Sequence, residues 1–275
     1  MRIASFTPAA TELLFELGVG EDLVGVSHDC DHPAAALFLP RLTRGYPPEL
    51  DFDALNDLSP DLIVAEARSP LPGVSDDELR TRAEDLDSQP MVIVLDPRTV
   101  GEVLDGARTI AQATDTKDAA VDLVRELSDR IDRVRVAVRR LRRPRVVALE
   151  RLDPPRAAGY WTPQLIHYAG GEDVLGFAGE EPQELGWPVV AASQPDIVLV
   201  TPTGLSAELA HREAEMHRGQ LASLGAREVI AVESVYFSRP GPRIVDGLEL
   251  LAELLHPERN PPNPSYAGRA LTVEI

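Results

Sequence analysis

The sequence is poor in residues that crosslink a chain, bind polyanions or cross a membrane. Its 275 residues include a single cysteine, Cys30, which excludes an internal disulfide. The 27 basic and 45 acidic residues give a formal net charge of −18, whereas nucleic-acid binders need a basic face. No apolar run approaches the ~18 residues that indicate a membrane span. We therefore expect neither nucleic-acid binding nor membrane insertion.

Signatures of catalysis are also missing. The sequence lacks the phosphate-binding pattern G-x-x-x-x-G-K-[ST], lacks G-x-G-x-x-G after a predicted strand, and lacks the G-x-S-x-G nucleophile turn. No acid stands paired with a base. These absences predict a protein that is not an enzyme and has no intrinsic cofactor or metal.

The first residues, MRIASFTPAA, bear on localisation. They show neither the basic and apolar regions of a signal peptide nor a lipid-attachment cysteine. As written, the sequence predicts a cytoplasmic protein. A periplasmic or cell-surface location is expected if an export segment has been removed.

Three blocks of sequence occur twice in the same order. TPAATELLFELGVGEDLVG from Thr7 resembles TPQLIHYAGGEDVLG from Thr162, SPDLIVAEA resembles QPDIVLVTP, and EVLDGARTIAQAT resembles RIVDGLELLAELL. The offsets are 151, 135 and 141 residues, about half the chain each time. Any one pair is compatible with chance, but three in order predict two lobes of related architecture.

Each predicted lobe alternates short apolar runs with helical patterns. That order is typical of an α/β fold with largely parallel sheets covered by helices. The expected strands are 2–6, 23–27, 62–67 and 92–96 in the first lobe and 145–150, 173–177, 196–202 and 229–234 in the second. The expected helices are 8–17, 75–86, 100–113, 163–169, 207–223 and 242–255.

A long helix is predicted between the lobes. Residues 116–142 contain neither Gly nor Pro, and Pro144 follows them. Apolar residues recur at spacings of four and three, which predicts one helix of roughly 40 Å with a single apolar stripe. A coiled-coil dimer stalk would explain the stripe, but its place between the repeats favours a helix that links two lobes. The stripe is Ala120, Val124, Leu127, Ile131, Val134, Val138 and Leu141.

These patterns define the expected organisation. The fold class is α/β, with two Rossmann-like lobes joined by a single long α-helix and a ligand cleft between the lobes. The expected domains are an N-terminal lobe over 1–114, the linking helix over 115–143 and a C-terminal lobe over 144–275. In such sheets ligands bind beyond the carboxyl ends of the strands, so residues that follow strands are the site candidates.

In the first lobe, three segments follow strands. Phe6 and Thr7 precede a helix, where Thr7 is either a plain N-cap or part of an anion or carbonyl site. Glu66 ends another strand and is either a site carboxylate or a solvated one. The loop SHDCDHP contains metal-ligand residue types, but their spacing matches no closed zinc pattern. A polar cleft loop is favoured there, and a ligand-held metal approached by His28 stays open.

In the second lobe, aromatic residues gather at loop positions. Only 5% of the chain is aromatic, yet both tryptophans and several other aromatic residues fall at these loop positions. Aromatic walls suit a large, flat, partly apolar ligand, although packing under loops is a serious alternative for each one. Arg239 and Arg243 either meet carboxylate or amide oxygens or cap the sheet edge. The aromatic candidates are Tyr160, Trp161, Trp187, Tyr236 and Phe237.

Four blocks resemble a known family over essentially the whole chain. They are RIASFTPAATELLFELGVGEDLVGVSHDCDHP, AGYWTPQLIHYAGGEDVLG, QPDIVLVTPTG and YFSRPGPRIVDGLELLAELLHPE. They resemble the cobalamin-binding branch of the helical-backbone periplasmic binding proteins, which are substrate-binding components of ABC importers. The resemblance implies two Rossmann-like lobes on one rigid helix, an ABC-importer permease as partner, and a corrinoid, haem or ferric siderophore as ligand.

The resemblance also implies site residues. An acidic residue on the outer face of each lobe would dock onto the transporter, and Glu78 and Glu208 are the candidates. The ligand cleft would be lined by Phe6, Thr7, His28, Asp29, Glu66, Tyr160, Trp161, Trp187, Tyr236, Phe237 and Arg239.

The expected function is non-catalytic binding of a large metal-chelate ligand. Cobalamin or another corrinoid is favoured, and a ferric siderophore or haem is the first alternative. The second alternative is an enzyme that uses His28, Cys30 and Glu66, or a direct divalent-metal binder that uses the 28–32 loop. We expect a monomer with little hinge motion on binding. The loop residues of the metal alternative are His28, Asp29, Cys30, Asp31 and His32.

Overall fold

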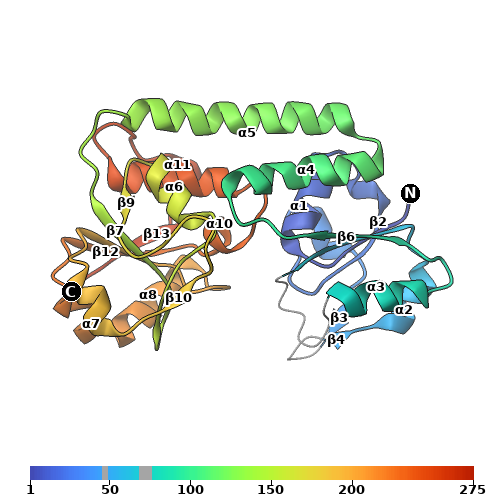
Figure 1. Cartoon of the computed structure of the whole chain (residues 1–275), viewed down its shortest axis with the longest axis horizontal. Coiled ribbons are helices and arrows are strands. Elements are labelled where there is room, and N and C mark those ends of the chain that lie inside the picture. The colour runs from blue at the N-terminus through green and yellow to red at the C-terminus, as the bar shows by residue number, and fades with distance from the viewer. Residues whose placement is uncertain (45–48, 68–75) are drawn as a thin grey trace. The chain divides into compact units, whose positions relative to one another are not determined.

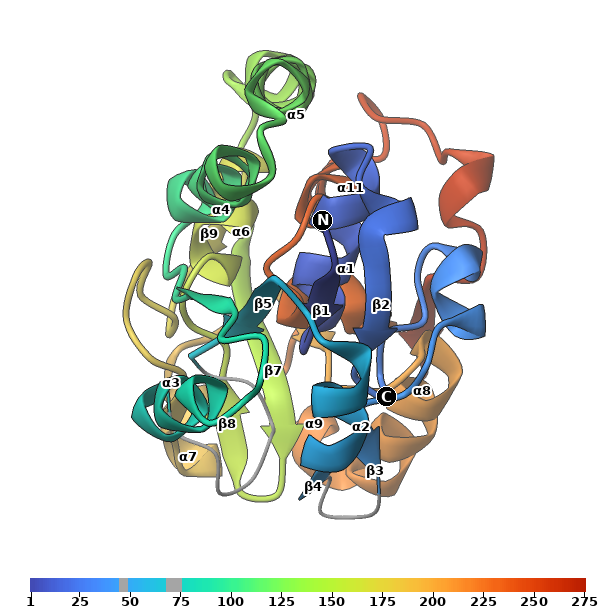
Figure 2. The same cartoon turned by 90° about the vertical axis from the view of Figure 1, so that its right-hand side faces the viewer.

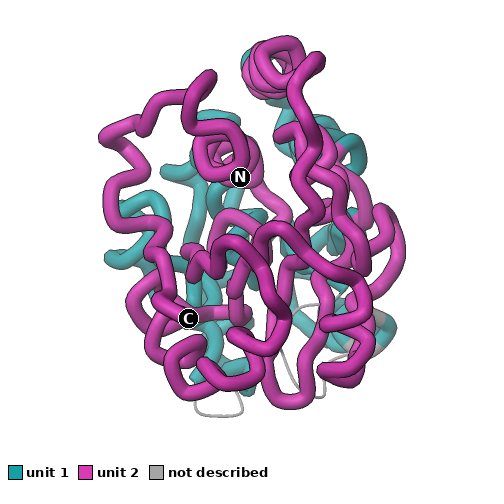
Figure 3. The backbone as a smooth tube through the Cα atoms, turned by 90° about the vertical axis from the view of Figure 1, so that its left-hand side faces the viewer, with its two compact units in different colours: residues 1–97, 101–126 teal, residues 98–100, 127–275 magenta. Residues whose placement is uncertain are grey.

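A computed structural model describes residues 1–44, 49–67 and 76–275 of the chain. The chain divides into two compact units, one formed by 1–97 with 101–126 and the other by 98–100 with 127–275 (Figure 3). Each unit alternates strands and helices around its own sheet (Figure 1), so the predicted α/β class is confirmed. In the described part of the chain, no helix has the length and apolar character needed to span a membrane.

Unit 1 is built on a parallel sheet with strand order β2-β1-β5-β6. All four strands were predicted from short apolar runs; β1, β2 and β5 are largely buried, whereas the residues of β6 are half-buried or exposed. A small antiparallel pair, β3 (Thr43–Arg44) and β4 (Glu49–Leu50), lies apart from this sheet. The strands are β1 (Ile3–Ser5), β2 (Leu23–Val26), β5 (Leu62–Glu66) and β6 (Met91–Leu95). The helices are α1 (Pro8–Glu16), α2 (Phe52–Leu58), α3 (Asp76–Glu84) and α4 (Val100–Thr114), with short 3-10 turns at Gly20–Asp22 and Ala34–Phe38.

Unit 2 has a seven-stranded mixed sheet of order β10-β8-β7-β11-β12-β13, with β9 paired to β7. Strands β9, β7, β11 and β12 are parallel, whereas β8, β10 and β13 pair antiparallel, so the prediction of a largely parallel sheet was wrong for these three strands. Helices α6 and α11 lie on one face, and α7 and α8 lie on the other (Figure 1). The strands are β7 (Arg145–Leu152), β8 (Pro155–Ala157), β9 (Glu172–Asp173), β10 (Gln183–Glu184), β11 (Ile197–Val200), β12 (Glu228–Val232) and β13 (Ala270–Val273). The helices are α6 (Thr162–Tyr168), α7 (Trp187–Ala192), α8 (Ala207–Met216), α9 (Arg218–Ser223), α10 (Val235–Ser238), α11 (Ile244–Leu255) and a 3-10 turn at Pro264–Tyr266.

Several local predictions for unit 2 were wrong. The expected strand at 173–177 stops at Asp173, because its Oδ1 accepts the N–H groups of Leu175 and Gly176 and turns the chain. The expected helix over 207–223 breaks at His217, which has φ −105° and ψ 17°, into α8 and α9. The edge strand β13 was not predicted. Trp187, expected in a loop, is the first residue of α7.

The long helix α5 (Lys117–Val138) follows from its apolar stripe. Six of the seven stripe residues lie within it, and each is at most 8% exposed. The helix contributes residues to both units. Since the stripe is already buried by the chain's own residues, the alternative of a coiled-coil dimer stalk is not supported. Arg130 of α5 also donates to Asp246 (2.5 Å) and Glu249 (2.9 and 2.8 Å) of α11.

The repeated Pro-Asp blocks form the same hydrogen bonds in each unit. In unit 1, the carboxylate of Asp61 accepts the N–H of Arg2 (2.7 Å), and the Asp61 N–H donates to the Arg2 carbonyl (2.8 Å). In unit 2, Asp196 and Arg145 form the matching pair at 2.9 and 2.8 Å. An aspartate at this place joins the amino ends of two neighbouring parallel strands. The internal repeat therefore reflects related local structure and not a chance match of letters.

Candidate functional site

The candidates of unit 1 lie at one edge of its sheet. Strands β2, β1 and β5 are adjacent and parallel, so their carboxyl ends meet at the same edge (Figure 2). Phe6 and Thr7 follow β1, His28 and Asp29 follow β2, and Glu66 ends β5. The strand-end rule thus brings all five predicted residues of this unit to one edge.

The side chains of Phe6 and Thr7 both have structural roles in this unit, one in the core and the other in a helix cap. The Phe6 ring is 1% exposed and belongs to the core cluster of this unit. The Thr7 hydroxyl accepts the N–H of Ala10 at 3.1 Å, which makes Thr7 the N-cap of α1. Glu66 is half-buried.

His28 is exposed but held in one orientation. Its backbone N–H donates to the Thr43 hydroxyl at 2.7 Å, and its Nδ1 lies 2.8 Å from the same oxygen. The Thr43 contact occupies Nδ1, so Nε2 is the nitrogen left for a ligand. Arg41 braces the loop by donating to the carbonyls of Ser27 and Cys30, both at 2.9 Å.

The cysteine of this loop is a buried, inert thiol. Cys30 is 0% exposed and lies 3.1 Å from the hydroxyls of Thr11 and Ser27. Burial raises the pKa of Cys30 to about 11, against the smaller lowering effect of those two hydrogen bonds. Across residues 1–44, 49–67 and 76–275, no three His, Cys, Asp or Glu side chains are grouped to hold a metal ion. The described geometry gives the direct metal-binding alternative no support.

Four of the five aromatic candidates of unit 2 form one cluster. The rings of Tyr160 and Trp161 stack at 5.8 Å, and the indole N–H of Trp161 donates to the Phe237 carbonyl at 2.7 Å. Tyr236, one residue earlier on α10, meets Tyr266 edge to face at 6.3 Å. These contacts join the start of α6 to α10, which follows the carboxyl end of β12.

Tyr160 has a constrained backbone. Its φ is +53°, which is unfavourable for residues other than glycine. Its N–H donates to the backbone carbonyl of Glu180 (2.7 Å), and its own carbonyl accepts the N–H of Gly179 (2.9 Å). A Cβ at Gly159 would lie 2.5 Å from the Glu180 carbonyl, so this close approach requires glycine. The ring is therefore positioned by the backbone before any ligand arrives.

The remaining predicted residues lie elsewhere. Trp187 is half-buried and packs against the core cluster on the α7 and α8 face of the sheet, apart from the aromatic cluster. Arg239 follows α10 directly and is half-buried, and Arg243 precedes α11.

The two docking candidates occupy helices. Glu78 lies in α3, and its side chain is outside the described residues. Glu208 lies in the first turn of α8, fully exposed, and accepts the Ser206 hydroxyl at 2.9 Å. A backbone N–H and that hydroxyl lower the pKa of Glu208, so it stays anionic.

Sequence reasoning missed three polar residues at the carboxyl edge of the unit 2 sheet. Glu150 lies near the end of β7, Thr201 directly follows β11, and Arg156 of β8 places Nε 3.0 Å from Glu150 Oε1. Burial raises the pKa of Glu150, while Arg156 and Arg151 oppose that rise. The strand-end rule would have found Thr201, but the return of β8 beside β7 had no sequence signal.

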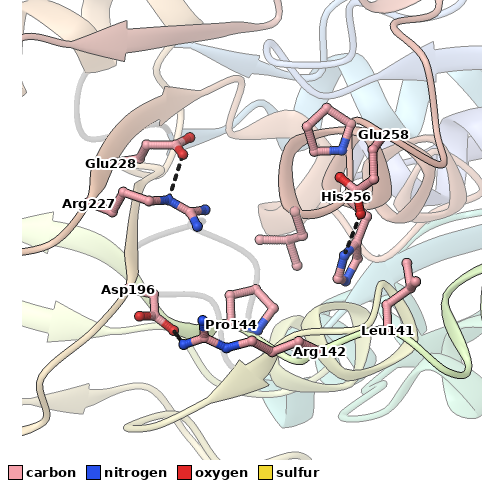
Figure 4. A pocket seen from close by; sticks show the side chains of 10 residues that line it. Leu141, Arg142, Pro144, Asp196, Arg227, Glu228, His256 and Glu258 are labelled. Atoms are coloured by element: carbon pink, nitrogen blue, oxygen red, sulfur yellow. Dashed lines mark hydrogen bonds and ion pairs between the residues drawn. The ribbon is translucent and has the colours of Figure 1, made fainter.

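A separate cavity opens at the opposite, amino end of the same sheet. It has a volume of about 480 Å³ and lies among Arg142, Asp196, Arg227, His256 and neighbouring residues (Figure 4). Its charges pair locally, with Arg142–Asp196 at 3.7 Å and Arg227–Glu228 at 2.9 Å. The cavity is distinct from the candidate site because its charges are paired locally and because it lies away from the carboxyl ends of the strands.

Comparison with known proteins gives a consistent assignment. The profile described as "Periplasmic binding protein" matches residues 3–222. A vitamin B12-binding protein of Vibrio cholerae is 24% identical over 92% of this chain and 88% of its own length.

Solved structures show the same fold. The periplasmic heme-binding protein BhuT, in complex with two hemes, matches with a TM-score of 0.74 and 25% identity over 92% of this chain and 97% of that one. The vitamin B12-binding protein BtuF of Vibrio cholerae matches with a TM-score of 0.72 and 19% identity, covering 92% and 96%. These matches agree with the predicted class of two α/β lobes and one long helix.

Proposed function

Because the chain belongs to the periplasmic binding protein family, we propose that it is the substrate-binding component of an ABC importer and that its ligand is cobalamin or another corrinoid. The similarity to a vitamin B12-binding protein over nearly its whole length supports this ligand class. The ligand would contact the carboxyl edge of each sheet, and its predicted position between the lobes is part of this proposal.

The observation that carries the proposal is the preset aromatic cluster of unit 2. Tyr160 stacks on Trp161, and the Trp161 indole N–H donates to the backbone carbonyl of Phe237, before a ligand is present. Trp161, Tyr236 and Phe237 are buried, so the half-buried Tyr160 is the ring of this group that a flat macrocycle would contact, and its preset position reduces the entropy cost of binding.

Haem is the second candidate ligand, for a specific reason. His28 is exposed and keeps Nε2 available while Thr43 holds Nδ1, an arrangement typical of metal-ligating histidines. BhuT, whose structure contains two hemes, is 25% identical to this chain. The same histidine would equally serve as an axial ligand of a corrinoid cobalt.

The partner and the compartment follow from the family. We propose that the protein acts outside the cytoplasmic membrane and delivers its ligand to a permease. Glu208 on α8 and Glu78 on α3 are the proposed docking residues, and the anionic, fully exposed carboxylate of Glu208 suits a basic partner surface.

The proposal is tested by titrating the purified protein with cyanocobalamin, cobinamide and haemin, following visible absorbance and calorimetric heat. We expect one-to-one binding of a corrinoid. Binding of haemin alone would refute the corrinoid assignment in favour of haem, and binding of none would overturn both. A shift of the metal bands that disappears in His28→Ala would assign the axial ligand.

A further inference from the structure

Two buried polar atoms without hydrogen-bond partners lie in unit 2 on β8 and directly after β11. In the described part of the chain, such atoms are Ser88 Oγ, Arg156 Nε, Asp173 Oδ2 and Thr201 Oγ1. Native structures satisfy most buried polar groups, so each exception requires an explanation. Of the four, Arg156 Nε lies 3.0 Å from Glu150 Oε1, and Thr201 follows β11, the strand paired with β7 that carries Glu150.

The sheet register places Glu150 and Thr201 side by side. Val200 pairs with Leu149, so the next residues, Thr201 and Glu150, continue the same ladder, and the Thr201 N–H donates to the Leu149 carbonyl at 2.9 Å. Leu149 and Val200 point into the core cluster beneath the sheet. Because side chains alternate along strands, Thr201 faces the opposite side of the sheet, the one covered by α6 and α11 (Figure 1), whereas Glu150 lies at a bulge of β7 against β8, between Leu149 and Arg151.

The chemistry of these three side chains is complementary but incomplete. Arg156 Nε lies 3.0 Å from Glu150 Oε1, close enough for an ion pair but without hydrogen-bond geometry. Thr201 is buried, with 4% of its surface exposed. Glu150 keeps acceptor capacity, while Arg156 and Thr201 each keep an unused donor. The cluster therefore offers an acceptor beside two donors.

We infer that Glu150, Arg156 and Thr201 form a subsite that recognises a carboxamide of the ligand. This inference rests on the proposed corrinoid function. A primary carboxamide donates N–H to a carboxylate and accepts from Arg156 Nε–H and the Thr201 hydroxyl. Corrinoids carry such amides around the ring, whereas haem carries carboxylates, which Glu150 repels. The subsite thus selects amide-bearing rings over acid-bearing ones.

The test compares two probes that differ in this group, dicyanocobinamide and dicyanocobyrinic acid, by calorimetry at neutral pH. We expect the wild-type protein to prefer cobinamide. In Glu150→Gln, the loss of a charge-assisted bond weakens cobinamide binding by about tenfold, and the loss of repulsion strengthens binding of the acid. The ratio of the two affinities therefore falls further than either affinity alone.

Thr201→Val and Glu184→Gln separate recognition from folding. Thr201→Val removes an unpartnered hydroxyl, so we expect unchanged or higher thermal stability together with severalfold weaker cobinamide binding. Glu184 of β10 is an exposed carboxylate that is ion-paired with Arg151 of β7, and Glu184→Gln should bind both probes like the wild type.

Each outcome supports or overturns the inference. Wild-type binding of cobinamide with an unchanged affinity ratio in Glu150→Gln would overturn the subsite and leave the proposed function standing. Equal weakening for both probes would indicate a structural role only and would overturn it as well. A wild-type protein that binds neither corrinoid would overturn the proposed function and this inference together.

Discussion

Asp173 should make the stability of this protein depend on pH in an unusual direction. Its Oδ1 accepts the N–H groups of Leu175 (3.0 Å) and Gly176 (2.7 Å), but its Oδ2 is buried and has no partner among the described residues. Burial raises the pKa of Asp173 from 3.8 to about 6, against the two backbone hydrogen bonds. Between these values the folded chain keeps a proton that the unfolded chain has released. The contribution of Asp173 to the free energy of unfolding therefore falls as pH rises from about 4 to 6.

The magnitude follows from the two pKa values. At about 1.4 kcal/mol per pH unit between them, ionised Asp173 costs about 3 kcal/mol at neutral pH. Asp173→Asn keeps the Oδ1 acceptor and removes the titration. Relative to the wild type, we expect its free energy of unfolding to increase by about 2 kcal/mol between pH 4.5 and pH 7.5.

Denaturant unfolding of both proteins at several pH values measures this difference. Asp22, in the first of the two Gly-Glu-Asp blocks, supplies the control, because it is exposed and paired with the N-terminal ammonium at 3.3 Å. Asp22→Asn should differ from the wild type by less than about 1 kcal/mol throughout. If the free energy of unfolding of Asp173→Asn differs from that of the wild type by the same amount at every pH, the reasoning is refuted.

Four further predictions concern Tyr160, the long helix α5 and the Cys30 thiol. Tyr160→Ala should weaken ligand binding by roughly tenfold or more in calorimetry, whereas Tyr168→Ala, at the far end of α6, should leave it near the wild-type value. Arg130→Met removes the ion pairs of two half-buried carboxylates, Asp246 and Glu249, and should lower the free energy of unfolding by about 2 kcal/mol, and an unchanged denaturation midpoint would contradict this. Cys30 should react with a thiol reagent only after unfolding, since it is buried with a raised pKa, and rapid labelling of the folded protein would disprove it. Because α5 runs without Gly or Pro between the units, scattering curves with and without ligand should nearly coincide, and a large compaction would count against a stiff linker.

Much of the architecture was predictable because its signals are local. Short apolar runs marked the central strands, and the stripe beginning at Ala120 marked α5. The three repeated blocks together predicted two related units, and the matching hydrogen bonds at Asp61 and Asp196 show why the Pro-Asp letters recur. In the central strands and in α5, the hydrophobic periodicity and the neighbouring capping or strand-joining side chains indicate the same element. These elements can therefore be predicted without knowing any distant contact.

Predictions failed where a distant or competing contact decides the structure. The strand expected after Asp173 is stopped by that residue's own side chain, which bonds the backbone two and three residues ahead. The strand β13 forms only because β12 offers it an edge to pair with. Trp187 is aromatic and near a strand end like the others, yet its helix packs it against the core on the other sheet face.

The sequence by itself determined the α/β class, the repeated units, the long helix and the carboxyl edges at which the candidate residues gather. These depend on periodicity and on the rule that parallel strands end at one edge. Only the tertiary structure decided which of those residues meet. The Trp161 indole reaches Phe237, 76 positions away, and Thr201 comes to lie beside Glu150 through the pairing of β11 with β7. Contacts across such separations depend on strand register and helix docking, which no local pattern of residues encodes.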